Sequence, residues 1–195
     1  MSKQAKVLNE QEFKKLLKVC ELTRYKARNR MIVMLSFMLG LRAVEIAKLR
    51  VSNVVSENGE ILDILVLDKT QTKGNKRNSV PISDKLSAEL KRYFIKYPQL
   101  LNDLSNRLLI SQKGVFSSQT IQHLFKHLYE LASIKQATSH SGRRSFITQL
   151  SENGIAVAVI QKLARHSSLA VTQRYIEVSD EKLRNAVNTV RVFGA

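Results

Sequence analysis

Four short segments of the sequence combine side chains that can bind an anion or transfer a proton. They are GLRAVEI with Arg42 and Glu45, TKGNKR with Lys73, HSGRR with His140 and Arg143, and the stretch from His166 to Tyr175. Guanidinium groups bind phosphate oxygens, imidazole and ammonium groups transfer protons, and a phenol can act as a nucleophile. The sequence has no carboxylate cluster for Mg²⁺ and no phosphate-binding loop for a nucleotide. The set is therefore consistent only with phosphodiester chemistry that needs no metal and no cofactor.

Each segment also has an ordinary structural explanation when it is taken alone. Arg42 and Glu45 could form a surface ion pair, and Lys73 could be one cation of an exposed β-turn. His140 and Arg143 lie three residues apart, which puts them on one face of a helix, but such a pair is common by chance. The functional interpretation therefore depends on all four segments occurring together.

The charge balance indicates a polyanionic partner. The 195 residues include 32 Lys and Arg against 16 Asp and Glu, which gives a formal net charge of +16. Nucleic acid is the commonest polyanion that such a surface binds, although ribosomal, membrane-surface and heparin-type binders share this composition.

Cysteine and hydropathy patterns exclude several other classes. Cys20 is the only cysteine, so the chain has no internal disulfide and no Cys/His cluster typical of zinc. The longest apolar run, 31–41, is too short to cross a bilayer, and the first residues lack a signal peptide. We therefore expect a cytoplasmic protein that makes no membrane contact.

The elements that must position the candidate residues can be predicted from apolar spacing, caps and glycines. Asn9 with Glu12 three residues later predicts a helix start, and Gly40 predicts a helix end. The runs VSNVV, ILDILVL and NSVPI between 51 and 82 predict about three antiparallel strands. The longer helices are expected near 10–22, 24–39, 84–97, 118–132, 140–153, 156–164, 168–178 and 180–190. The fold class is α+β, one mostly helical domain over 1–195 with a small three-stranded antiparallel sheet.

The order Arg, Lys, His-x-x-Arg, His and Tyr resembles the tyrosine recombinase (phage integrase) family. The matching segments are GLRAVEIAKL, TKGNKRNSVPI, HSGRRSF and LARHSSLAVTQRYIEVS, which run from Gly40 to Ser179. The spacing of nine residues between His166 and Tyr175 is part of the match. The resemblance implies the catalytic-domain fold of that family and a site-specific DNA recombinase or integrase, encoded by a prokaryotic cell, a phage or a mobile element and associated with the nucleoid.

The resemblance also implies a mechanism. Tyr175 would attack a DNA phosphodiester and form a 3′-phosphotyrosyl link, which frees a 5′-hydroxyl. Arg42 and Arg143 would clamp the non-bridging oxygens, His140 would act as general base, and Lys73 would protonate the leaving oxygen. Because the covalent link keeps the energy of the phosphodiester, neither ATP nor a metal is required, as in type IB topoisomerases.

Two further residues match the family, and three complicate the match. His166 would hydrogen-bond the phosphate, and Glu45 takes the acidic supporting place. Lys76 is a rival for the general-acid role. Arg165 stands where family members often have Gly, and Arg144 is an additional cation after the His-x-x-Arg motif.

The resemblance predicts the domain organisation as well. Family members typically carry an N-terminal core-binding domain that closes a clamp on DNA. The first matching motif begins at Gly40, so we expect that domain to be absent from residues 1–195. The chain is then an isolated catalytic domain or a natural short member.

Double-stranded DNA at a specific recombination site is the partner that the resemblance implies. The tail after Tyr175 has an apolar stripe at near-helical spacing, formed by Val178, Leu183, Ala186, Val187 and Val190. This tail either folds back on its own core or, as is common in the family, docks on a neighbouring protomer. The second arrangement predicts a homo-oligomer, a tetramer, on DNA.

Three alternatives remain open from the sequence. The chain could be a catalytically inactive, DNA-binding relative, or a helix-turn-helix regulator with 168–178 as its recognition helix and Tyr175 as a core aromatic. It could also be a type IB topoisomerase, which relaxes DNA without exchanging partners. Whether the natural reaction is integration, excision, inversion or resolution is not encoded in these motifs.

Overall fold

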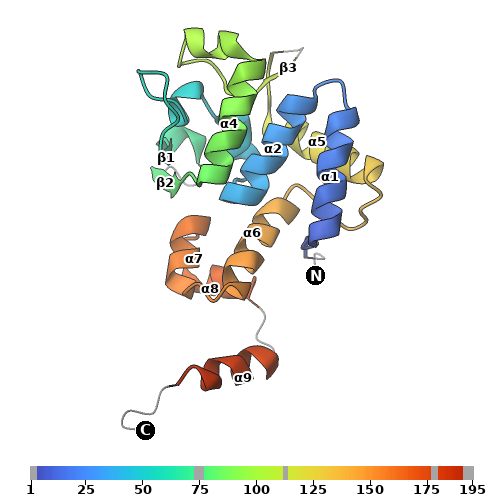
Figure 1. Ribbon diagram of the computed structural model, residues 1–195, viewed down its shortest axis with the longest axis vertical. Coiled ribbons are helices and arrows are strands. Elements are labelled where there is room, and N and C mark those ends of the chain that lie inside the picture. Colours follow the sequence, from blue (N-terminus) through green and yellow to red (C-terminus); the bar gives the residue numbers. More distant parts are fainter. Residues whose placement is uncertain (1–3, 73–76, 112–113, 177–179, 191–195) are drawn as a thin grey trace.

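The computed structural model describes residues 4–72, 77–111, 114–176 and 180–190 (Figure 1). The described part is mostly helical, as the sequence predicts. Its helices are α1 (Glu10–Leu22), α2 (Lys26–Leu39), α3 (Ala43–Lys48), α4 (Asp84–Lys96), α5 (Ser118–Leu131), α6 (Ser141–Glu152), α7 (Val157–Ala164), α8 (Leu169–Gln173) and α9 (Asp180–Asn188). Three short 3-10 helices cover Val51–Asn53, Lys69–Gln71 and Pro98–Asn102.

Helix α2 forms the centre of the fold. It packs against α1, α4 and α6 and runs through the middle of the upper body in Figure 1. Every side chain from Met31 to Phe37 is buried, because neighbouring helices cover α2 on nearly all sides. The longest apolar run of the sequence is therefore a core helix. None of the described helices is both long and apolar enough to span a membrane.

Local sequence signals determine where α1 begins and where α2 ends. The Asn9 side chain accepts a hydrogen bond from the amide of Glu12, and the Glu12 carboxylate accepts one from the Asn9 amide, so the predicted capping box is present. Gly40 ends α2 with a φ of +58°. A Cβ at Gly40 would lie 2.7 Å from the ring of Phe146, so only glycine fits both this conformation and this contact. The chain then turns directly into α3, whose N-cap is Arg42.

The prediction of a three-stranded sheet is wrong. The described residues form two separate two-stranded antiparallel sheets, one pairing β1 (Ile64–Leu67) with β2 (Asn78–Pro81) and one pairing β3 (Ile110–Ser111) with β4 (Gly114–Val115). The run VSNVV begins as a 3-10 helix over Val51–Asn53, and only Val55 at its end forms an isolated bridge, with Ile61. Val51, Val54 and Val55 are all buried in the core. A strand would place alternate residues on opposite faces and would expose one of them.

Helices α6 and α7 and the turn after α8 share a second, smaller hydrophobic core beside the site. Ile147, Ile160 and Ala164 make up this core, against which Tyr175 packs. The helix predicted over 168–178 is shorter than expected, since α8 ends at Gln173 and Tyr175 lies in the turn that follows. The described part of 168–178 thus lacks the recognition helix that a helix-turn-helix regulator would need. Helix α9 lies apart from the rest of the chain in Figure 1.

Candidate active site

Arg143 links α6 by hydrogen bonds to the end of α2 and to the end of α7. It lies in the first turn of α6 and is only 3% exposed. Its Nη1 donates to the Gly40 carbonyl at 2.7 Å, and its Nη2 donates to the carbonyl of Ala164. Gly142 permits this arrangement, because a Cβ there would lie 2.2 Å from the Ser36 hydroxyl of α2. Close contact between α2 and α6 therefore holds the guanidinium of Arg143 in place.

Glu45 connects two further guanidinium groups. Arg42 caps α3, and its amide donates to Glu45 Oε2 at 2.7 Å while its Nη1 donates to Oε1 at 3.0 Å. Arg165 Nη2 donates to Oε2 at 3.0 Å. The Glu45 side chain is 1% exposed, whereas that of Arg42 is 26% exposed. The pair is thus no ordinary surface ion pair, and Arg42 is the member that reaches solvent.

His166 and Tyr175 lie against each other beyond the end of α7. Their rings stack with centroids 5.3 Å apart and planes 26° apart. His166 Nδ1 lies 2.9 Å from the hydroxyl of Thr172, a fully buried residue of α8. The Tyr175 amide donates to the Thr172 carbonyl at 3.0 Å. Thr172 therefore orients the imidazole through its side chain and the tyrosine through its backbone.

Burial and crowding of positive charge set the ionisation of the site. Burial, together with the charges of Arg143, Arg42 and Arg165, lowers the pKa of His166 to about 4. Burial with the charges of Arg42 and Arg165 lowers the pKa of Arg143 to about 9. Burial would raise the pKa of Glu45, but the surrounding guanidinium groups hold that pKa below 4.5. Near neutral pH the site therefore contains a neutral imidazole, three guanidinium cations and one carboxylate.

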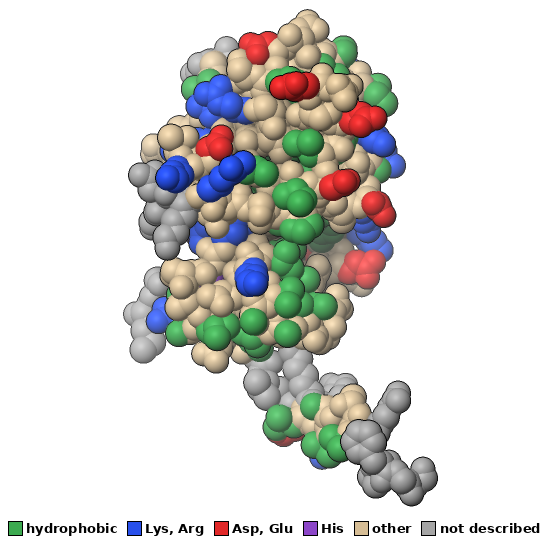
Figure 2. Space-filling model, turned by 90° about the vertical axis from the view of Figure 1, so that its left-hand side faces the viewer, with side chains coloured by type: hydrophobic (Ala, Val, Ile, Leu, Met, Phe, Trp, Pro, Cys, Tyr) green, Lys and Arg blue, Asp and Glu red, His purple; other side chains and the backbone are tan. Residues whose placement is uncertain are grey.

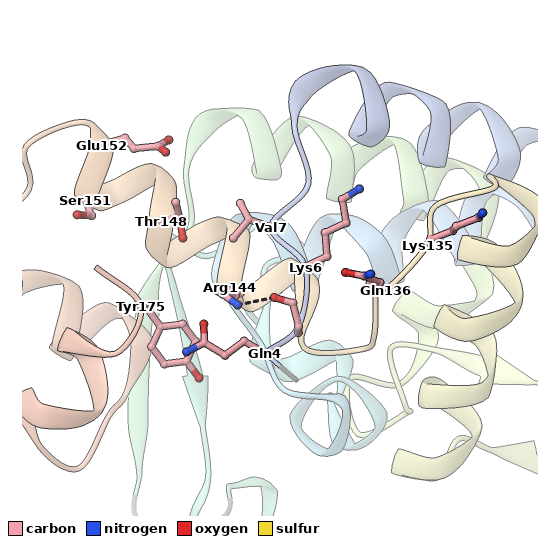
Figure 3. Close-up of a pocket in the computed structure, with 11 residues that line it drawn as sticks. Gln4, Lys6, Val7, Lys135, Gln136, Arg144, Thr148, Ser151, Glu152 and Tyr175 are labelled. Atoms are coloured by element: carbon pink, nitrogen blue, oxygen red, sulfur yellow. Dashed lines mark hydrogen bonds between the residues drawn. The ribbon is translucent and has the colours of Figure 1, made fainter. Parts of the chain in front are cut away.

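The Tyr175 ring borders two adjoining cavities. One, of about 730 Å³, is lined by Gln4 and Arg144 among others, and Figure 3 shows the side chains of Gln4 and Arg144 beside the ring. The second, of about 660 Å³, is also lined by His140 and Arg174. Arg144 fastens the N-terminal segment here, since its Nη1 donates to the Ala5 carbonyl at 2.8 Å (Figure 3). The phenol is therefore accessible to a ligand from outside the protein.

The structure gathers most of the residues that the sequence singled out. Arg42, Glu45, Arg143, His166 and Tyr175 come together from the α2–α3 junction, α6 and the α7–α8 region. His140, at the start of α6, is exposed and shares a cavity with the tyrosine. Lys73 and its rival Lys76 lie outside the described residues.

Two residues of the site were missed or only partly anticipated. Thr172 gave no signal, because a threonine six residues after a histidine is unremarkable until the α7–α8 turn brings the two together. Arg165 stood out only as a departure from a family pattern, and its contact with Glu45 spans 120 residues of sequence. Within the described ranges, no three His, Cys, Asp or Glu side chains lie close enough to bind a metal ion. The site presents cations to an incoming ligand.

Comparisons with known proteins give matches over most of the chain. Residues 6–182 match the family described as the phage integrase family. Tyrosine recombinase XerA of Pyrococcus furiosus is 34% identical over 188 residues, covering 96% of this chain and 63% of the relative. Tyrosine recombinase XerD of Staphylococcus saprophyticus is 32% identical over 165 residues, covering 83% of this chain and 54% of the relative. This chain therefore spans less than two thirds of the length of these relatives.

Solved structures share the fold. The crystal structure of XerA recombinase has a TM-score of 0.74 at 24% identity, over 97% of this chain and 68% of that one. XerH site-specific recombinase bound to its difH substrate in a pre-cleavage complex has a TM-score of 0.73 at 19% identity, over 97% and 56%. The catalytic domain of bacteriophage HP1 integrase has a TM-score of 0.68 at 23% identity, over 95% of both chains.

Proposed function

The chain belongs to the phage integrase family, and from this premise we propose that it is a site-specific tyrosine recombinase. It cleaves and rejoins double-stranded DNA through a 3′-phosphotyrosyl intermediate at Tyr175, with neither metal nor ATP. The observation that carries the proposal is that His166 stacks on the accessible ring of Tyr175, while Arg143 interacts electrostatically with both Tyr175 and Arg42. Residues 1–195 act as one catalytic domain.

In the proposed cleavage step, the phenolic oxygen of Tyr175 attacks the phosphorus and displaces the 5′ oxygen of the next nucleotide. His140 takes the phenolic proton, and Lys73 gives a proton to the departing 5′ oxygen. Arg42 and Arg143 stabilise the negative charge that develops on the non-bridging oxygens. One P–O bond forms as another breaks, so the attack of a 5′-hydroxyl from a partner strand reverses the step without external energy.

The proposed role of His166 follows from its ionisation. With a pKa of about 4, the imidazole is neutral at the pH of a cell. If the Thr172 hydroxyl donates to Nδ1, Nε2 carries the proton and is free to donate to a phosphate oxygen. His166 therefore acts as a hydrogen-bond donor of fixed orientation rather than as a cation.

The decisive experiment is the capture of the covalent intermediate. We would incubate the protein with a pool of nicked duplexes that share flanks but carry a randomised centre. A nick beside the cleavage position lets the short fragment with the new 5′-hydroxyl diffuse away, so the strand cannot be rejoined and the adduct is trapped. We expect an SDS-resistant protein–DNA adduct that is enriched for one sequence. Digestion should recover the DNA on the peptide that contains Tyr175. Failure to form any adduct under conditions in which the protein binds the pool would favour an inactive relative.

DNA binding should depend strongly on salt, because the net charge of +16 implies that phosphate contacts supply most of the affinity. Each neutralised phosphate contributes a slope of about −0.9 in log K against log salt, so two such contacts already weaken binding about 12-fold between 50 and 200 mM. We expect at least this loss by fluorescence anisotropy on the selected duplex. An affinity unchanged over this range would contradict a phosphate-dominated interface.

The tail is proposed to join protomers on DNA. Leu183, Val187 and Val190 are 55%, 70% and 73% exposed, and the lower part of Figure 2 shows hydrophobic side chains on this segment. Deleting 180–195 should reduce multimeric complexes on DNA by about 10-fold or more while the thermal unfolding midpoint stays within a few degrees. Native gels with the selected duplex and circular dichroism measure the two effects. A truncated protein that simply unfolds would indicate instead that the tail packs on its own core.

A further inference from the structure

Arg165 ends α7 in a backbone conformation that disfavours an arginine. Its φ is +56°, in the left-handed region that glycine adopts most readily. Its side chain is nevertheless 2% exposed and fully directed into the protein. Strain of this kind persists where surrounding contacts hold the residue in place, and it is found often at functional sites. The contacts of the guanidinium therefore indicate what holds Arg165 there.

Those contacts link α7 to the α2–α3 junction. Nη1 donates to the Leu39 carbonyl at 3.2 Å and to the Leu163 carbonyl at 2.9 Å. Nη2 donates to the Gly40 carbonyl and to Glu45 Oε2, both at 3.0 Å. Each terminal nitrogen thus serves two acceptors, which a planar guanidinium can do and a lysine ammonium cannot reproduce.

The two oxygens of the Glu45 carboxylate have different hydrogen-bond donors. Oε2 is held by Arg165 and by the backbone of Arg42, and Oε1 is left for the Arg42 side chain. Among the described contacts, the side chain of Arg42 thereby engages the acid through Nη1 alone. Three guanidinium groups, including Arg143, face one carboxylate, so the cluster carries a net charge of +2 against the doubly negative transition state of phosphoryl transfer.

We propose that Arg165 is a positioning residue that neutralises Glu45 from behind and so leaves the guanidinium groups of Arg42 and Arg143 available to the scissile phosphate. This role rests on the proposed recombinase function. Without Arg165, Glu45 would be buried with Arg42 as its main counter-ion, and that pairing would draw Arg42 away from the phosphate. The net charge of the cluster would also fall by one.

The test compares three substitutions with a matched control. Arg165→Gly relieves the backbone strain and removes the cation with its four hydrogen bonds. Arg165→Leu removes the same cation and hydrogen bonds but keeps the strained backbone, and Arg165→Lys keeps a charge without the four hydrogen bonds. Ser133→Gly is the control, because Ser133 is exposed, follows the end of α5 and has a similar φ of +54°. We expect Arg165→Gly and Arg165→Leu to form the adduct 10- to 100-fold more slowly on the selected duplex, with DNA affinity within about 3-fold of the native value. Ser133→Gly should react at the native rate.

A pH profile separates positioning from a merely structural role. Glu45 faces Arg42, Arg143 and Arg165, and His166 faces the same three cations with Tyr175 stacked on it. Loss of Arg165 should raise the pKa of Glu45, so the acid limb of the adduct rate should move to higher pH in Arg165→Gly and Arg165→Leu. Arg165→Lys should restore the limb toward its native position. Native rates and an unshifted limb in Arg165→Gly, or equal losses of binding and rate, would overturn the proposal.

A second measurement needs no DNA. The depressed pKa of Glu45 stabilises the native fold above the ordinary carboxyl pKa, and that contribution is lost as the pH falls. The difference in urea unfolding free energy between the native chain and Arg165→Gly should therefore grow from about pH 4 to pH 7. A constant difference would show that Arg165 does not hold Glu45 ionised. If the native chain forms no adduct, the recombinase function fails, whereas this result still decides the Arg165–Glu45 coupling.

Discussion

The Tyr175→Phe variant should bind the selected duplex with native affinity and form no covalent adduct, a loss of more than about 1,000-fold. The substitution removes one oxygen and keeps the ring, which stacks on His166 and packs against the small core of Ile147, Ile160 and Ala164. Because the residue is only half-buried, losing the hydroxyl should change the free energy of unfolding by about 0.5 kcal/mol or less. The effect is therefore chemical rather than structural.

The measurement is an SDS gel of the labelled nicked duplex after incubation with protein, with anisotropy for binding and circular dichroism for folding. Tyr97→Phe is the matched control, because Tyr97 is also half-buried but follows α4 and contacts Tyr93. The control should form the adduct at the native rate. An adduct that persists in Tyr175→Phe would move the nucleophile to another residue and would remove the main support for the proposed mechanism.

Local signals in the sequence predicted those parts of the fold that local interactions determine. The Asn9 capping box, the apolar run of α2 and the stop at Gly40 each depend on residues within one or two helical turns, and each was confirmed. The strand predicted at VSNVV was wrong, because Val51, Val54 and Val55 are buried by tertiary packing that turns the chain. Pattern alone does not distinguish a strand from such a turn.

The site shows the same division between local and long-range determinants. Residue types and chain order predicted Arg42, Glu45, Arg143, His166 and Tyr175, which the fold does bring together. The number of cationic side chains among them can be counted from the sequence, but how deeply each one is buried cannot. The neutral state of the His166 imidazole, for example, follows from burial and from three guanidinium groups, one in α6 and two at the caps of α3 and α7. No spacing rule connects those segments.

The second large effect is expected at Arg143. The Arg143→Ala variant should form the adduct at least about 100-fold more slowly, by comparison with the loss of one donor to a developing oxyanion. The alanine also leaves the Ala164 carbonyl without its guanidinium donor, which should lower the free energy of unfolding by about 1–3 kcal/mol. The Gly40 carbonyl keeps a second donor, Arg165, so we expect the site to remain folded.

A stability loss alone would not explain the rate, and His166 provides the test. Arg143 is the strongest of the charges that lower the pKa of His166 to about 4. In Arg143→Ala, the NMR titration midpoint of the His166 ring should therefore move up toward its ordinary value near 6.5. Between pH 4 and 6.5, His166 binds fewer protons in the native fold than in the unfolded chain. Native stability therefore falls as the pH drops from about 6.5 to 4. That fall should be shallower in the variant.

The matched control is Arg92→Ala, which removes an exposed guanidinium of α4 that pairs with Glu89. It should leave both the adduct rate and the His166 midpoint at native values. A slow Arg143→Ala with an unmoved His166 midpoint would mean that the guanidinium does not face the imidazole, and the phosphate could not then lie between them. A native adduct rate in Arg143→Ala would contradict the proposal that Arg143 stabilises charge on the non-bridging phosphate oxygens. The two readouts thus separate where Arg143 points from what it contributes to the reaction.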